Sequence, residues 1–155
     1  GFNNDFDGSS AKLTRHVVQF KQKPIFILID NLSTDRRHNL KLTQNFNLDS
    51  NVLIENEDNE VKLTSNETTL TVKQFNELTS YEVVQGRFEP PVAVNATGFA
   101  KVEKTNQLNY ENETNKKNAF LTAVFDETYI KNVNIQIENS TVKIIFNDEE
   151  YYIYI

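Results

Sequence analysis

The stretch that decides the fold runs from Leu13 to Leu48 and reads LTRHVVQFKQKPIFILIDNLSTDRRHNLKLTQNFNL. Two apolar runs, Val17–Phe20 and Ile25–Ile29, lie on either side of a short polar segment. After a polar loop, a third run places four apolar residues and one glutamine at every second position. These residues are Leu40, Leu42, Gln44, Phe46 and Leu48. Alternation with period two is typical of half-buried strands, so this stretch predicts three successive strands.

Short runs rich in Val, Ile, Thr, Phe and Tyr continue to the end of the chain, separated by turns rich in Asn and Asp. They predict further strands over residues 52–54, 61–63, 68–72, 81–84, 98–102, 119–125, 133–137, 142–146 and 151–155. The run at 119–125 is apolar almost throughout, which is typical of a strand buried on both faces. No long run has the apolar spacing of an amphipathic helix.

These patterns predict an all-β fold class, namely an antiparallel two-sheet β-sandwich of ten or more short strands, with a barrel as the second choice. At 155 residues we expect one domain over 1–155, with 1–12 as a loop or frayed end. The chain starts with Gly1 and contains no Met, so we infer a processed or excised piece of a longer protein. A residue left over from cloning is the alternative explanation of Gly1.

The composition of the chain argues against a nucleic-acid partner and against a membrane span. The formal net charge is −6 and no basic stripe occurs, which argues against a nucleic-acid partner. No apolar run approaches the about 20 residues of a membrane span. The absence of Cys rules out disulfides and thiolate metal sites, and it suits a secreted or cell-surface bacterial protein.

Candidates for catalysis are few. Neither a Cys nor a G-x-S-x-G motif is present, and the two histidines are His16, in a predicted strand, and His38, in a loop. Their separation does not match a zinc site. Asp30 directly follows an apolar strand, so we expect it to be part-buried and to cap a strand-ending turn at Leu32 or Ser33. We assign no catalytic, cofactor-binding or metal-ligating residue from these patterns.

The N-terminal segment has the beginning of a calcium-binding loop. Oxygen-bearing side chains and a glycine occur at Asn3, Asp5, Asp7 and Gly8. An EF-hand loop needs a glutamate at its twelfth position, and that position is Thr14. We therefore interpret this segment as a polar turn and predict no metal.

Aromatic residues near loops could form a platform for sugar binding, since aromatic faces stack on sugar C–H groups. Four such residues are Tyr81, Phe88, Tyr110 and Tyr129. The three tyrosines of the last predicted strand are instead expected to pack within the sheets. They are Tyr151, Tyr152 and Tyr154.

An ordered set of segments resembles the C-terminal β-sandwich of the heparinase II/III-like polysaccharide lyases. Thr14–Phe20 matches a basic strand, although Arg15 precedes His16 where the family more often has the reverse order. Lys23-Pro24 and the Phe26–Leu32 strand with its Asp-x-Leu ending follow, and then His38 and the strand Asn39–Phe46. Gly98-Phe99-Ala100, Lys101–Gln107 and the late apolar strand Ala119–Val124 with Thr122 complete the set, which spans Thr14 to Phe125.

The resemblance implies a parent enzyme that cleaves acidic polysaccharide by β-elimination, with its catalytic Tyr and His on an N-terminal α-helical domain. It implies that the present sandwich packs against that domain, walls one side of its cleft and is inactive alone. No catalytic or metal residue is carried over. The alternative function is a carbohydrate-binding or adhesion module of a bacterial surface protein.

Overall fold

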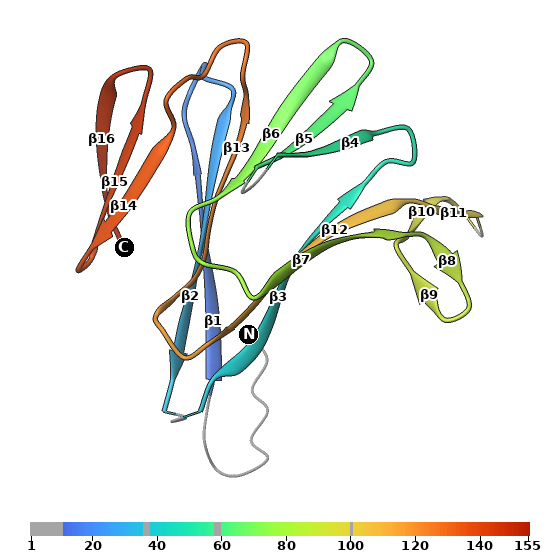
Figure 1. The fold of residues 1–155 in the computed structure, drawn as a ribbon, viewed down its shortest axis with the longest axis horizontal. Helices are drawn as coiled ribbons and strands as arrows, with labels where there is room; N and C mark the ends of the chain where they lie inside the picture. Colours follow the sequence, from blue (N-terminus) through green and yellow to red (C-terminus); the bar gives the residue numbers. More distant parts are fainter. Residues whose placement is uncertain (1–10, 36–37, 58–59, 100) are drawn as a thin grey trace.

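The computed structural model describes residues 11–35, 38–57, 60–99 and 101–155 (Figure 1). Within these ranges every regular element is a strand, and every strand pair is antiparallel. The predicted all-β antiparallel class is confirmed, and the number of strands agrees with the ten or more expected. The predicted polar turn with Asn3, Asp5, Asp7 and Gly8, and Ala100 of the family-like segment, lie outside the described residues.

The opening stretch forms the three strands that its alternation predicts. They are β1 (Ala11–Gln19), β2 (Ile25–Thr34) and β3 (Leu40–Leu48). Strand β1 begins two residues inside the 1–12 segment that was expected to be a loop. It pairs with β2 so that Arg15 lies opposite Asp30. Strand β3 belongs to a different sheet from β1 and β2.

A six-stranded central sheet has the order β1-β2-β13-β6-β5-β4. Its remaining strands are β4 (Leu53–Glu57), β5 (Glu60–Ser65), β6 (Thr68–Gln74) and β13 (Asn118–Asp126). Strand β13 inserts between β2 and β6, so the late apolar run becomes an inner strand of the sheet. A run with apolar residues at consecutive positions fits this place because both of its faces are covered.

Two three-stranded sheets flank the central sheet (Figure 1). The first has the order β3-β12-β7, with β7 (Ser80–Gln85) and β12 (Asn106–Thr114). The second, which we call the C-terminal sheet, consists of β14 (Asn134–Glu138), β15 (Thr141–Phe146) and β16 (Glu149–Tyr154). The predicted sandwich corresponds to the central sheet and β3-β12-β7, and the C-terminal sheet adds a third layer.

Each face of the central sheet belongs to a separate hydrophobic core. The C-terminal core joins the side chains of Ile25, Ile27 and Ile29 to those of the C-terminal sheet, including Ile144. The inter-sheet core joins Leu32, Val72 and Phe120 to Leu108 and Tyr110 of the β3-β12-β7 sheet. Strands β2 and β13 contribute to both cores, because side chains of a strand alternate between its two faces.

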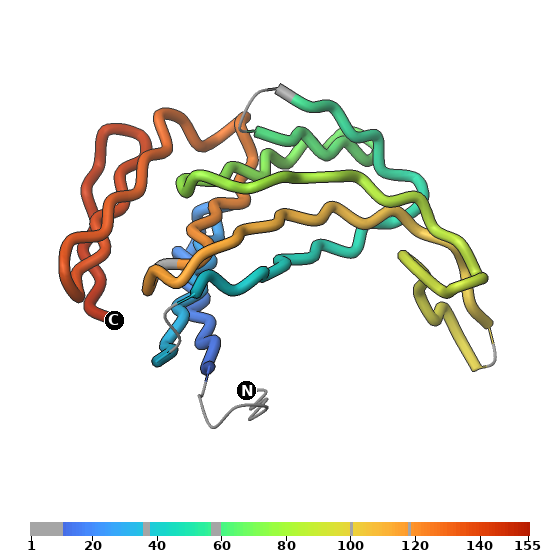
Figure 2. Tube along the Cα trace, turned by 60° about the horizontal axis from the view of Figure 1, so that its bottom comes forward, coloured from blue at the N-terminus to red at the C-terminus, as the bar shows by residue number. Residues whose placement is uncertain are grey.

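Two short hairpins extend from the β7–β12 side of the molecule, at the end far from the C-terminal sheet (Figure 2). They consist of β8 (Arg87–Phe88), β9 (Pro91–Val92), β10 (Val94–Gly98) and β11 (Lys101–Lys104), and we call residues 86–104 the arm. The base of the arm is held by two backbone hydrogen bonds of 2.8 Å, from Gly86 N to Thr105 O and from Thr105 N to Ala93 O. A Cβ atom at Gly86 would lie 2.4 Å from Ala93 O, so only glycine fits there.

Candidate functional site

A buried ion pair joins the first two strands of the central sheet. Asp30 is fully buried within β2 and accepts hydrogen bonds from Arg15, with Nε 2.6 Å from Oδ1 and Nη2 2.7 Å from Oδ2. This bidentate contact raises the pKa of the Arg15 guanidinium. The burial predicted for Asp30 is confirmed. The expected cap at Leu32 or Ser33 is wrong, because β2 continues through both residues and the carboxylate binds Arg15 instead.

Gln44 carries this polar network across the inter-sheet core. It lies on β3 and is buried, as its place in the alternating series predicts. Its Nε2 donates to Asp30 Oδ2 at 3.0 Å. Its Oε1 accepts from Gln74 Nε2 and from Thr122 Oγ1, both at 2.8 Å. One side chain thus ties the β3-β12-β7 sheet to three strands of the central sheet.

The network has the properties of a structural element. Asp30 and Thr122 have no exposed surface, and Gln44 is 1 % exposed. A general base must reach the proton that it removes, so a carboxylate enclosed in this way cannot act on a polysaccharide. Satisfied polar groups of this kind fix the register and spacing of the layers around them.

Two buried polar atoms beside the network have no hydrogen-bond partner within the described residues. They are Gln74 Oε1 and the Tyr110 hydroxyl. Because Gln44 Oε1 is an acceptor, Gln74 must present its NH₂ group there, and its Oε1 then points away from the network. Burial, and next the nearby Tyr81, raise the pKa of Tyr110, so its hydroxyl stays protonated at neutral pH.

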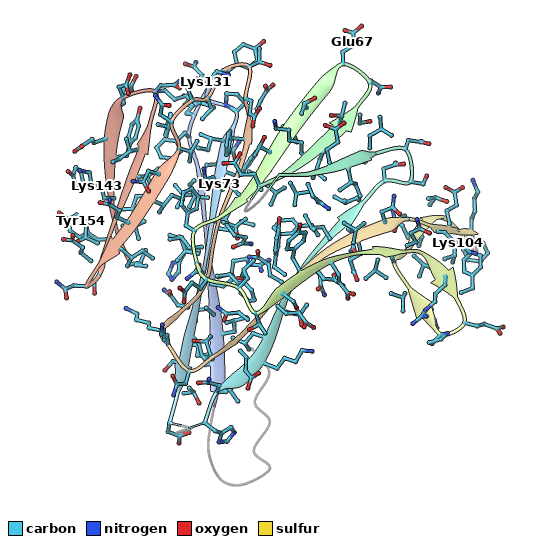
Figure 3. All side chains as sticks on the ribbon, in the orientation of Figure 1. Glu67, Lys73, Lys104, Lys131, Lys143 and Tyr154 are labelled. Carbon is cyan, nitrogen blue, oxygen red and sulfur yellow. The ribbon has the colours of Figure 1, made fainter. Side chains whose placement is uncertain are left out.

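A cleft with a volume of about 850 Å³ is lined by both of these residues. It is bounded by the ends of β6 and β7, by β12, by the start of β14 and by the β6–β7 connection, residues 75–79. Its lining side chains include Gln74, Phe75, Leu78, Tyr81 and Tyr110. Lys73, labelled in Figure 3, also lines it. Tyr110 lies opposite Tyr81 on β7 and opposite Gln44 on β3, so the three residues form one row across the sheet.

The structure separates the aromatic residues proposed as a sugar platform. Tyr81 is half-exposed in the cleft, and Tyr110 is buried in the strand β12 next to it, with 6.1 Å between ring centroids. Tyr110 is therefore not the loop residue that was expected. Phe88 lies on the arm, and Tyr129 is exposed beside the C-terminal sheet, so neither joins this pair. No local pattern could have identified this pair, because Tyr81 and Tyr110 meet only through the pairing of β7 with β12.

The tyrosines of the last strand differ in how far they are buried. Tyr151 packs as predicted, with its ring stacked 4.9 Å from that of Phe146. Tyr152 is 57 % exposed and Tyr154 is 82 % exposed, so the predicted packing is wrong for both. Tyr154 projects outward from the C-terminal sheet (Figure 3). Alternation explains the difference, because residues 152 and 154 face away from the central sheet.

The histidines lie on separate elements. His16 is half-buried on β1 and His38 is exposed before β3. Among the described residues, no group of three or more His, Cys, Asp or Glu side chains is placed to hold a metal ion. No helix in the described part of the chain is long and apolar enough to cross a membrane.

One solved structure shares this fold over almost the whole chain. The crystal structure of the heparan sulfate lyase HepC from Pedobacter heparinus superposes with a TM-score of 0.59 over 99 % of this chain, at 16 % identity. The chain corresponds to 27 % of the length of that lyase. No protein-family model and no curated protein matches the sequence. At 16 % identity, this comparison shows a shared fold alone.

Proposed function

We propose that this chain is the C-terminal β-sandwich of a heparinase II/III-like polysaccharide lyase, and that it supports an N-terminal α-helical domain of the same parent chain. The observation that carries the proposal is the fold similarity to HepC, which covers 99 % of this chain and only 27 % of that lyase. The ordered sequence resemblance from Thr14 to Phe125 supports the same family independently.

The arrangement of side chains supports a non-catalytic role for the isolated chain. β-Elimination requires a base that reaches the proton beside the uronic carboxylate, and donors that stabilise the resulting charge. The carboxylate of Asp30 is enclosed, and the Tyr110 hydroxyl is buried with a raised pKa. His16 and His38 lie on different elements. In this proposal the acidic polysaccharide is bound and cleaved by the parent enzyme, which is secreted or displayed on a bacterial surface.

The test begins with the gene. We expect the region upstream of the Gly1 codon to encode a helical domain with a Tyr/His pair. The parent protein should then form unsaturated product from heparin, heparan sulfate or alginate-type substrates, detected by ultraviolet absorbance, and the isolated chain should form none.

Two results would contradict the proposal. Turnover by the isolated chain would place the reactive groups within it. A signal peptide followed directly by further β modules would favour the adhesion alternative.

A further inference from the structure

We propose that the cleft beside the β6–β7 connection binds an uncharged sugar residue, with Gln74 and Tyr110 as its polar contacts and Tyr81 as its aromatic face. This inference does not depend on the parent being a lyase. It rests on the unpartnered polar atoms, the aromatic wall and the charges of the cleft.

The polar atoms select a hydroxyl group. Gln74 Oε1 can only accept a hydrogen bond, whereas the protonated Tyr110 hydroxyl can donate one. A sugar hydroxyl can donate to the first and accept from the second. Carboxylates and sulfates carry no proton at neutral pH, so they leave Gln74 Oε1 without a partner. Because unpartnered buried polar groups are costly, a ligand that satisfies both gains affinity.

The β6–β7 connection can give access to these atoms. Its ends are fixed by hydrogen bonds of 2.9 Å from Phe75 N to Leu121 O and from Thr79 N to Glu111 O. Residues 75–79 line both the 850 Å³ cleft and a second cleft of about 580 Å³. Because the connection borders two clefts, we infer that it shifts and uncovers the buried polar atoms when a ligand enters.

The remaining walls suit one face of a sugar ring. Tyr81 is 39 % exposed, which leaves part of its ring available for stacking. Phe75 and Leu78 add apolar surface beside it. An apolar lining with a few placed polar groups is the usual character of a small-ligand site.

The charges disfavour an anionic ligand. Lys73 is the one cation among the described lining residues, and its ammonium group is paired with Glu60 and lies 5.7 Å from the Phe75 ring centroid. Glu77 adds a negative charge to the same wall. The cleft therefore favours an uncharged sugar unit over a uronate or a sulfated one.

Isothermal titration of the full chain with cellotetraose, chitotetraose and a heparan sulfate tetrasaccharide tests the proposal. We expect at least one uncharged tetrasaccharide to bind, and to bind more tightly than the anionic one. Tyr110→Phe removes only the hydroxyl and should weaken binding about tenfold, the loss of one hydrogen bond. Tyr81→Ala should also weaken it. Tyr129→Phe changes an exposed tyrosine outside the cleft and is the matched control.

A stability measurement separates binding from folding. Because the Tyr110 hydroxyl has no partner within the described residues, Tyr110→Phe should melt at or above the wild-type temperature at neutral pH. Hydrogen exchange should show protection of residues 75–79 when the sugar is bound. Binding that is absent for both uncharged probes, unchanged in a folded Tyr110→Phe variant, or tighter for the anionic probe would overturn the proposal. A lyase-active parent combined with any of these results would leave the proposed function intact.

Discussion

At the scale of single residues, the two partners of the Arg15–Asp30 ion pair differ in their exposure to solvent. The side chain of Asp30 is 1 % exposed, whereas that of Arg15 is 46 % exposed. Removing Arg15 leaves a buried carboxylate without its charge partner, but removing Asp30 leaves a guanidinium that water can reach. The cost of breaking a buried pair comes mainly from the charge that remains.

We therefore predict that Arg15→Ala lowers the free energy of unfolding by about 3 kcal/mol, and by more than Asp30→Ala does. Urea unfolding followed by circular dichroism measures both variants. Lys41→Ala removes the exposed pair with Glu111 and should leave the urea midpoint unchanged. Equal losses for Arg15→Ala and Asp30→Ala would show that burial does not decide the cost.

The raised pKa of Tyr110 predicts that the folded state loses stability at alkaline pH. Its pKa is raised in the folded state, while in the unfolded chain it returns to about 10. The stabilisation from its bound proton is complete below that value and is lost as the pH rises towards the folded pKa, at up to about 1.4 kcal/mol per pH unit. Between about pH 10 and 11, the thermal unfolding temperature should fall more steeply for the wild type than for Tyr110→Phe. Parallel declines would contradict this assignment.

At the scale of elements, alternation predicted what a strand contributes but not which strand it meets. The series from Leu40 to Leu48 correctly placed Gln44 among apolar neighbours on one face. Its partners come from positions 30, 74 and 122, so no local pattern could identify them. The cleft was missed for the same reason, since the order of the strands in the sheets brings Tyr81, Tyr110 and Gln74 together.

The arm offers an element-scale prediction at Gly86. A Cβ there would lie 2.6 Å from Thr105 O and 2.7 Å from Thr105 N, and backbone atoms cannot move aside as a flexible side chain can. Gly86→Ala should cost about 1–3 kcal/mol, as overpacking does, and should speed hydrogen exchange at the Gly86 and Thr105 amides. Gly98→Ala is the control, since the nearest atom lies 3.9 Å from its Cβ. Unchanged exchange in Gly86→Ala would mean that the base of the arm tolerates a side chain.

At the scale of the whole molecule, two cores share one sheet. The apolar run of β13 already indicated a strand covered on both faces, whereas β2 was expected to be half-buried. The structure covers both faces of each strand. The third layer was not predicted, because alternation in β15 and β16 shows that one face is buried without showing against what. The inward faces of those strands complete the C-terminal core around Ile25, Ile27 and Ile29.

Sharing strands should make the two cores unfold together. Ile144 in the C-terminal core and Leu108 in the inter-sheet core are both fully buried, so replacing either by Ala should cost about 2–5 kcal/mol. Because β2 and β13 cannot lose one cover and keep their native surroundings, each variant should lower a single transition. The free energy of protection against hydrogen exchange should then fall by the same amount for the amides of β14–β16 and for those of β3-β12-β7. Tyr154→Ala, at a site 82 % exposed, should change neither. If Ile144→Ala opened the C-terminal sheet alone, that layer would be an independent unit.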